Sequence, residues 1–200
     1  MKSRESGSAL ITVILVVFVL TMVGIASLLY MSVEDRLSSN DQQQKAALYA
    51  AESGLRRGEL AINDQATANP SILSTMISYT SGTTPALTLP DNGYSATILR
   101  TAYGGGGVEL ADVALPHNVG GTLTYSLYVR NNKEDSSGSA TVDGDKRINI
   151  VSVGILRDQT GRTFRKILEE QLFAGGAGGI NGGNPDLDAG GTGSAGIGGH

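Results

Sequence analysis

The feature that most constrains this chain is a stretch without any charged side chain, residues 6–33. A helix that crosses the hydrocarbon core of a membrane needs about 20 apolar residues, and this stretch is longer than that. Lys2 and Arg4 precede it, whereas Glu34 and Asp35 follow it. Because basic residues are retained on the cytoplasmic side, we expect the amino terminus in the cytoplasm and the rest of the chain outside.

Two other interpretations compete with a membrane-spanning helix that the mature protein keeps. A conventional secretory signal has an apolar region of about 7–15 residues that ends at a small-x-small cleavage site. Residues 6–33 exceed that length, which argues against such a signal. A simple membrane anchor fits the length and stays open as an alternative.

The composition excludes several classes of site. The 200 residues include no cysteine and two histidines, which rules out disulfides, thiolate metal sites and multi-histidine sites. The net charge is -4 and there is no basic stripe, so no nucleic-acid partner is predicted. No nucleophile and base occur at a recognisable spacing, and His117 lies in a turn-like Leu-Pro-His-Asn segment. We therefore predict that the protein is not an enzyme.

The helix is predicted to continue well past the membrane. No proline occurs between Glu34 and Ile62, and the charged residues there fall mostly away from one face. We expect one helix over residues 8–62, whose outer half is amphipathic and needs a domain to cover it. Together with Gln44 and Ile62, the residues expected to pack on that domain are Leu37, Leu48, Ala51 and Leu55.

Residues 63–173 are predicted to form that domain, as an antiparallel sheet after a loop-rich lead-in. Asp158 to Gly161 separates two strand-like segments, which predicts a hairpin. Residues 166–171 also fit a helix, but the β-branched partner segment favours a strand. The fold class is therefore α+β, a long N-terminal helix packed on a small antiparallel sheet. The expected strands are residues 94–99, 108–115, 122–130, 147–156 and 162–173, with Leu123, Tyr125, Leu127 and Val129 on one face.

The carboxyl-terminal tail, residues 174–200, is dominated by glycine and small polar residues. Such a segment buries too little apolar surface to offset its ordering entropy, so a flexible tail is expected. Docking of this tail onto a neighbouring molecule is the alternative.

One polar cluster is a candidate cation site. Calcium prefers six to eight oxygen ligands, and five side chains could converge at the base of one hairpin. The spacing differs from that of an EF-hand loop, and an exposed acidic loop of Asx-turn residues is the competing interpretation. No cofactor is predicted beyond this candidate Ca²⁺ site. Its residues are Asn131, Glu134, Asp135, Asp143 and Asp145.

The head of the chain resembles the class III signal of type IV prepilins, a short charged leader that ends in glycine before an apolar helix. That resemblance implies that a membrane peptidase removes residues 1–7 by cutting between Gly7 and Ser8. The first sixty residues are similar to the amino-terminal region of PilX-type minor pilins. The segments that carry the similarity are Gly7-Ser-Ala-Leu, Leu20-Thr-Met-Val-Gly-Ile-Ala, Glu34-Asp-Arg, Asn40 and Ala46-Ala-Leu-Tyr-Ala-Ala-Glu-Ser-Gly54.

One position departs from the major-pilin pattern. In major pilins the fifth mature residue is a glutamate that pairs with the amino terminus of a neighbouring subunit, whereas here it is Thr12. A buried charge without its partner is costly in an apolar environment. A subunit at the fibre tip has no subunit ahead of it, so the resemblance implies an initiating or tip subunit.

The resemblance implies a structural subunit of a type IV pilus. Its partners would be other pilins, the prepilin peptidase, the inner-membrane assembly platform and the membrane itself. It would reside in the bacterial inner membrane, with a cytoplasmic amino terminus and an extracytoplasmic domain, and then on the pilus at the cell surface. Two alternatives stay open: a minor pseudopilin of a type II secretion system, and a single-pass membrane-anchored binding protein.

Overall fold

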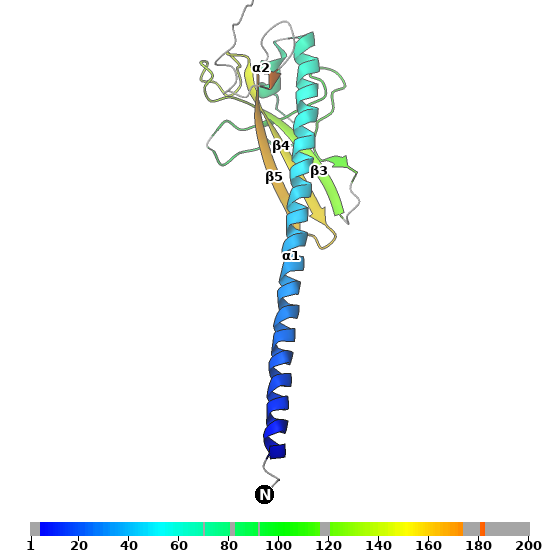
Figure 1. Cartoon of the computed structure of the whole chain (residues 1–200). Coiled ribbons are helices and arrows are strands. Elements are labelled where there is room, and N and C mark those ends of the chain that lie inside the picture. Colours follow the sequence, from blue (N-terminus) through cyan, green and yellow to red (C-terminus); the bar gives the residue numbers. More distant parts are fainter. Residues whose placement is uncertain are drawn as a thin grey trace, which may run out of the picture. The chain divides into compact units, whose positions relative to one another are not determined.

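The computed structural model describes residues 5–69, 71–80, 83–91, 93–116, 121–173 and 181–182 (Figure 1). The chain divides into two units, residues 1–43 and residues 44–200. The elements are α1 (Glu5–Ala68), α2 (Ile72–Ser78), β1 (Thr97–Ile98), β2 (Val113–Leu115), β3 (Gly121–Asn131), β4 (Arg147–Asp158), β5 (Thr163–Phe173) and β6 (Asn181–Gly182). This order confirms the predicted α+β class.

The sheet of the second unit is antiparallel in every described pair, with the order β1-β3-β4-β5-β6 and β2 also paired to β3. The three long strands form its centre, and Leu127 lies opposite Ser152, which lies opposite Leu168. Gly161 closes the β4–β5 hairpin with a φ of 83°, a left-handed conformation that glycine adopts without strain. The predicted hairpin is confirmed, and the helical alternative for residues 166–171 is wrong because this segment pairs along β4.

One face of the sheet is covered by the part of α1 that belongs to the second unit, from Gln44 onward (Figure 1). The helix lies very close to β4 because both surfaces carry small residues. A Cβ atom at Gly154 would overlap the carbonyl oxygen of Ala47 and lie 2.6 Å from the amide nitrogen of Ala51. The side of α1 that is buried against the sheet consists of Ala47, Ala50, Ala51, Gly54, Gly58, Ile62 and Ala66.

The opposite face of the sheet is covered by the segment before β1. Leu89 and Ala96 are buried there against Val151. The four residues that the sequence placed on one face of β3 are all buried, and Thr124 and Ser126 on the other face are buried as well. Both faces of β3 are buried because the segment before β1 crosses the second face.

Arg130 links the segment before β1 to the sheet through hydrogen bonds to Asp91 and Glu169. Its guanidinium forms two hydrogen bonds of 2.7 Å to the carboxylate of Glu169 on β5 and further hydrogen bonds to Asp91. Only 6% of the Arg130 side chain is exposed. The Arg130 guanidinium, with the backbone N–H of Gly93, holds the pKa of Asp91 far below its usual range.

Two features of the chain before β1 differ from the sequence prediction. α1 continues to Ala68 instead of ending at Ile62, since residues 63–68 contain no proline or glycine and Ala66 is buried. The additional short helix α2 buries Leu73, Met76 and Ile77 in the core that α1 and the sheet share. The spacing of these three residues is typical of a helix, but the sequence analysis assigned this short segment to a loop.

The strands also differ from the prediction in extent. The three long strands were expected within about two residues of their observed ends, whereas β1 and β2 are shorter than predicted. Most of the glycine-rich tail, residues 174–180 and 183–200, lies outside the described residues. Within it, β6 pairs with Leu172 and Phe173 at the edge of β5.

Candidate functional site

The first unit, residues 1–43, carries the most unusual surface of the molecule. Every large apolar side chain from Leu10 to Val33 is between 49% and 73% exposed. Among the described residues, α1 is the one helix whose length and composition would let it cross a membrane, and its most apolar stretch has a mean hydropathy of 2.8. This surface requires lipid or other protein to cover it.

The polar side chains within this apolar segment are satisfied inside the helix. The hydroxyl of Thr21 donates to the carbonyl oxygen of Val17 at 2.7 Å, and that of Ser27 donates to the carbonyl oxygen of Val23 at 2.9 Å. An unpaired hydroxyl in hydrocarbon would cost several kcal/mol, so these bonds make the segment compatible with a bilayer.

The predicted processing site lies at the amino-terminal end of the same helix. α1 begins at Glu5, so the peptide bond between Gly7 and Ser8 falls within its first turns. Thr12, the fifth residue after that bond, lies on the exposed helix. The side chains of residues 5–9 and all of residues 1–4 lie outside the described part of the chain.

The four residues expected to pack α1 on the sheet are found in three environments. Ala51 is fully buried, whereas Leu48 and Leu55 are half-buried. Leu37 lies in the first unit and is 69% exposed. The buried side of α1 is therefore offset from the expected stripe, because the close approach to Gly154 admits alanine and glycine but not leucine.

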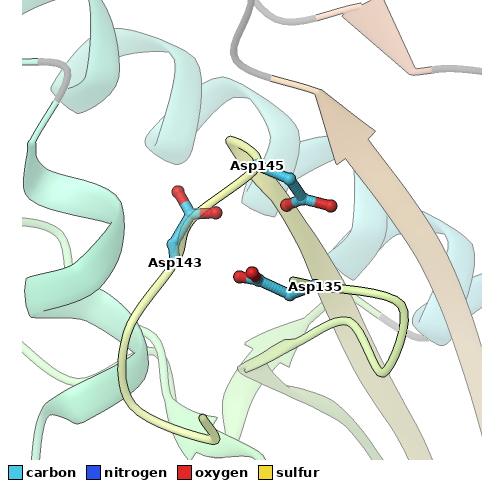
Figure 2. Close-up of side chains that lie close together, drawn as sticks. All are labelled: Asp135, Asp143 and Asp145. Atoms are coloured by element: carbon cyan, nitrogen blue, oxygen red, sulfur yellow. The ribbon is translucent and has the colours of Figure 1, made fainter. Parts of the chain in front are cut away.

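The acidic loop is residues 132–146, which connect β3 to β4. It brings together Asp135, Asp143 and Asp145, each of which places a carboxylate oxygen within 4.8 Å of the others. Figure 2 shows Asp135 on one arm of the loop facing Asp143 and Asp145 on the other arm. Three of the five predicted ligands are thus assembled by the fold.

Asp135 is held by three hydrogen-bond donors. The backbone N–H groups of Ser137 and Gly144 donate to it at 2.8 and 2.7 Å, and the side-chain amide of Asn131 donates at 3.0 Å. These donors lower the pKa of Asp135 to about 2. Its carboxylate is therefore ionised and fixed in place at neutral pH.

Asp143 has a different environment. Burial, opposed by the backbone N–H of Lys146 and reinforced by the charges of Asp145 and Asp135, raises the pKa of Asp143. Its backbone N–H donates to the hydroxyl of Ser74 at 3.3 Å, which joins the loop to α2. Asp145 in turn accepts hydrogen bonds from the backbone N–H of Arg147 and the side-chain amide of Asn132, both at 2.9 Å.

The two remaining predicted ligands do not join the three aspartates. Glu134 is exposed and outside the cluster. Asn131 is buried, but its Oδ1 accepts from the backbone N–H of Asn132 and its Nδ2 also donates to the carbonyl oxygens of Ser139 and Val142. Asn131 therefore organises the loop through hydrogen bonds, one of them to Asp135, and its neighbour Asn132 donates to Asp145. The Asn131-Asn132 pair was the signal in the sequence that the prediction did not use.

The His117 imidazole, considered in the sequence analysis as a catalytic base, lies outside the described residues.

Comparison with known families addresses α1. Residues 6–56 match the family model described as PilX N-terminal. The amino-terminal segment of this chain is similar to the PilX N-terminal family. The resemblance predicted from the sequence is confirmed, and it supports assignment to the minor pilins of type IV pili.

The PilX match covers about a quarter of the chain and ends within α1. It includes the exposed apolar segment and also the small residues Ala47, Ala51 and Gly54 that pack on the sheet. No curated protein and no solved structure matches the chain. Together with this match, the exposed apolar helix fits a membrane-anchored pilin.

Proposed function

We propose that this chain is a minor pilin that initiates a type IV pilus and occupies its tip or a position near it. The observation that carries the proposal is the coincidence of the PilX match, residues 6–56, with the exposed apolar segment from Leu10 to Val33. A prepilin peptidase would cut between Gly7 and Ser8 on the cytoplasmic face of the inner membrane. The domain formed by residues 44–200 would then stand outside the membrane.

Assembly would move the apolar segment from lipid into a bundle of pilin helices. Lipid tails and apolar side chains are similar environments, so the exchange needs no large hydrophobic free energy. The side-chain hydroxyls of Thr21 and Ser27 keep their intrahelical partners in both environments. The assembly platform would drive this step, and the neighbouring major and minor pilins would supply the packing.

Thr12 supports the tip position. A carboxylate at this position would pair with the amino terminus of the subunit ahead, and a threonine hydroxyl provides no charge for that pair. An ammonium group left without a carboxylate inside an apolar bundle is costly. A subunit with no other subunit ahead of it avoids that cost.

The test is the position and abundance of the protein in sheared fibres. Gold labelling and cross-linking should place the wild-type protein at fibre ends, at few copies per fibre. Thr12→Glu should raise its abundance in the shaft several-fold, because it restores a charge partner, whereas the isosteric control Thr12→Gln should not.

Even distribution of the wild-type protein along fibres would contradict the tip position. A deletion strain that loses protein secretion but keeps its pili would assign the chain to a secretion pseudopilus instead. Complete absence from fibres of either kind would favour a membrane-anchored binding protein.

A further inference from the structure

The three aspartates of the acidic loop lie at the spacing of ligands around one ion. Calcium binds oxygen at about 2.3–2.6 Å, so two ligands on opposite sides of the ion are about 4.8 Å apart. The carboxylate oxygens of Asp135, Asp143 and Asp145 all lie within 4.8 Å of one another. Each of the three side chains can therefore contact the same ion without a change in the backbone.

The negative charge of this cluster is not balanced by neighbouring basic side chains. Among the described residues, Arg100 pairs with Glu109 and Arg130 pairs with Asp91 and Glu169, and no ion pair found there involves the three aspartates of the loop. Backbone N–H groups and amides stabilise the individual carboxylates but carry no net charge. Three carboxylates held together in this way repel one another at neutral pH.

A second observation, independent of the acidic residues, comes from Asn132. This side chain is 1% exposed, and its Nδ2 donates to Oδ2 of Asp145 at 2.9 Å, so its amide is directed at the cluster. Its Oδ1 is buried and has no hydrogen-bond partner among the described residues. A buried amide oxygen without a partner is unfavourable.

Rotation of the Asn132 amide by 180° would exchange the positions of its oxygen and nitrogen. The oxygen would then face Asp145 and the centre of the cluster, which is favourable only if a cation lies there. The same reasoning applies to Oδ1 of Asp143, which is also buried and lacks a hydrogen-bond partner within the described residues. A bound cation would give both oxygens a partner and would replace the hydrogen bond that the Asn132 amide nitrogen donates to Asp145.

We propose that the acidic loop binds one Ca²⁺ ion through the carboxylates of Asp135, Asp143 and Asp145 and the amide oxygen of Asn132. The ligands are all oxygens, which favours a hard cation over zinc or copper. Four side chains on an irregular loop suit the flexible coordination of calcium better than the strict octahedron of magnesium, and water completes the shell. The ion would tie the two arms of the loop together and, through Asp143 and Ser74, fasten the loop to α2.

The experiment uses the full chain in detergent, first treated with a chelator and then titrated with CaCl₂ by isothermal calorimetry. We expect one Ca²⁺ per chain, with a dissociation constant of about 10⁻⁴ M or tighter. In 10 mM CaCl₂ the unfolding midpoint should rise by about 5 °C or more. MgCl₂ at the same ionic strength should give a much smaller rise.

Two variants separate binding from a general effect of charge. Asp143→Asn removes the charge of one ligand, and no hydrogen bond to Oδ1 is lost. The variant should therefore fold in the absence of Ca²⁺, and its affinity for Ca²⁺ should be at least tenfold lower than that of the wild type. Glu134→Gln removes one negative charge from the same loop outside the cluster, and its affinity should equal that of the wild type.

The proposal would be overturned by absence of binding heat in the wild type. It would equally be overturned by unchanged affinity in Asp143→Asn, or by equal losses in Asp143→Asn and Glu134→Gln. None of these outcomes bears on pilus assembly, so the site stands or falls independently of the proposed function.

Discussion

A side chain at Gly154 would collide with the backbone of α1 at Ala47 and Ala51. The Gly154→Ala substitution should therefore push the helix away from the sheet and lower the free energy of unfolding by about 2–3 kcal/mol. Urea denaturation of the full chain in detergent measures this loss. Gly105→Ala is the matched control, since a Cβ there meets nothing within 4 Å, and it should change stability by less than about 0.5 kcal/mol. Equal stability of the two variants would contradict the close packing described here.

Asp91 provides a prediction about pH. Its hydrogen bonds from Arg130 and Gly93 hold its pKa in the folded state below the ordinary value of 3.8, so the ionised form stabilises the fold. That contribution is fully present above the ordinary value and is lost as the pH falls through the lowered pKa. Asp91→Asn should therefore unfold at a lower temperature than the wild type at pH 5–7. The difference should shrink below about pH 4.

Thermal unfolding of both proteins between pH 7 and pH 2 checks this expectation. Glu134→Gln, which removes an exposed carboxylate, controls for the change in net charge. A difference between Asp91→Asn and the wild type that stays constant down to pH 2 would contradict the ion pair with Arg130.

At the acidic loop, the sequence predicted the residue types better than their roles. The Asp-Gly-Asp segment of residues 143–145 follows Asp135 closely enough in sequence for one loop to bring the carboxylates together. It does not reveal which aspartate each of the two adjacent asparagines contacts. That depends on the hydrogen bonds by which Asn131 closes the loop between β3 and β4.

At the scale of elements, α1 serves two kinds of contact along its length. From Gln44 to Ala68 its small residues pack on the sheet, whereas residues 10–37 expose their apolar side chains. Leu37 belongs to the exposed group at 69%. Leu37→Gln should leave the unfolding midpoint of the domain unchanged within about 1 °C, because no described contact within the domain depends on it.

The same variant should reduce the amount of this protein recovered in sheared fibres, since Leu37 would face neighbouring pilins. Quantitative immunoblots of sheared and cell-bound fractions measure the ratio. Leu48→Gln is the contrasting variant, because Leu48 is half-buried and its loss should lower domain stability. Full incorporation of Leu37→Gln would show that this part of α1 makes no assembly contact.

The long strands were predictable because their signal is local. Alternation along residues 122–130 and the β-branched residues of β4 define strands without reference to the rest of the fold. The second buried face of β3 was not predictable in this way. It results from Leu89 and Asp91, which are distant in sequence and reach Val151 and Arg130 only in the folded chain.

At the scale of the whole molecule, the chain joins a segment that requires a membrane or a helix bundle to a domain with its own core. The PilX match, residues 6–56, extends over both parts of α1 and ends before the strands begin. The domain carries the acidic loop and the sheet, for which no curated protein or solved structure provides a match.

The central claim is that this chain is processed as a prepilin and retains its apolar helix for assembly. Intact-mass spectrometry of the protein purified from membranes of cells that contain a prepilin peptidase tests it most directly. The claim predicts a mature chain that begins at Ser8, with or without a methyl group on its amino terminus, and an unprocessed chain in cells that lack the peptidase. A chain that keeps residues 1–7 in both strains, or one that begins beyond Val33, would contradict it.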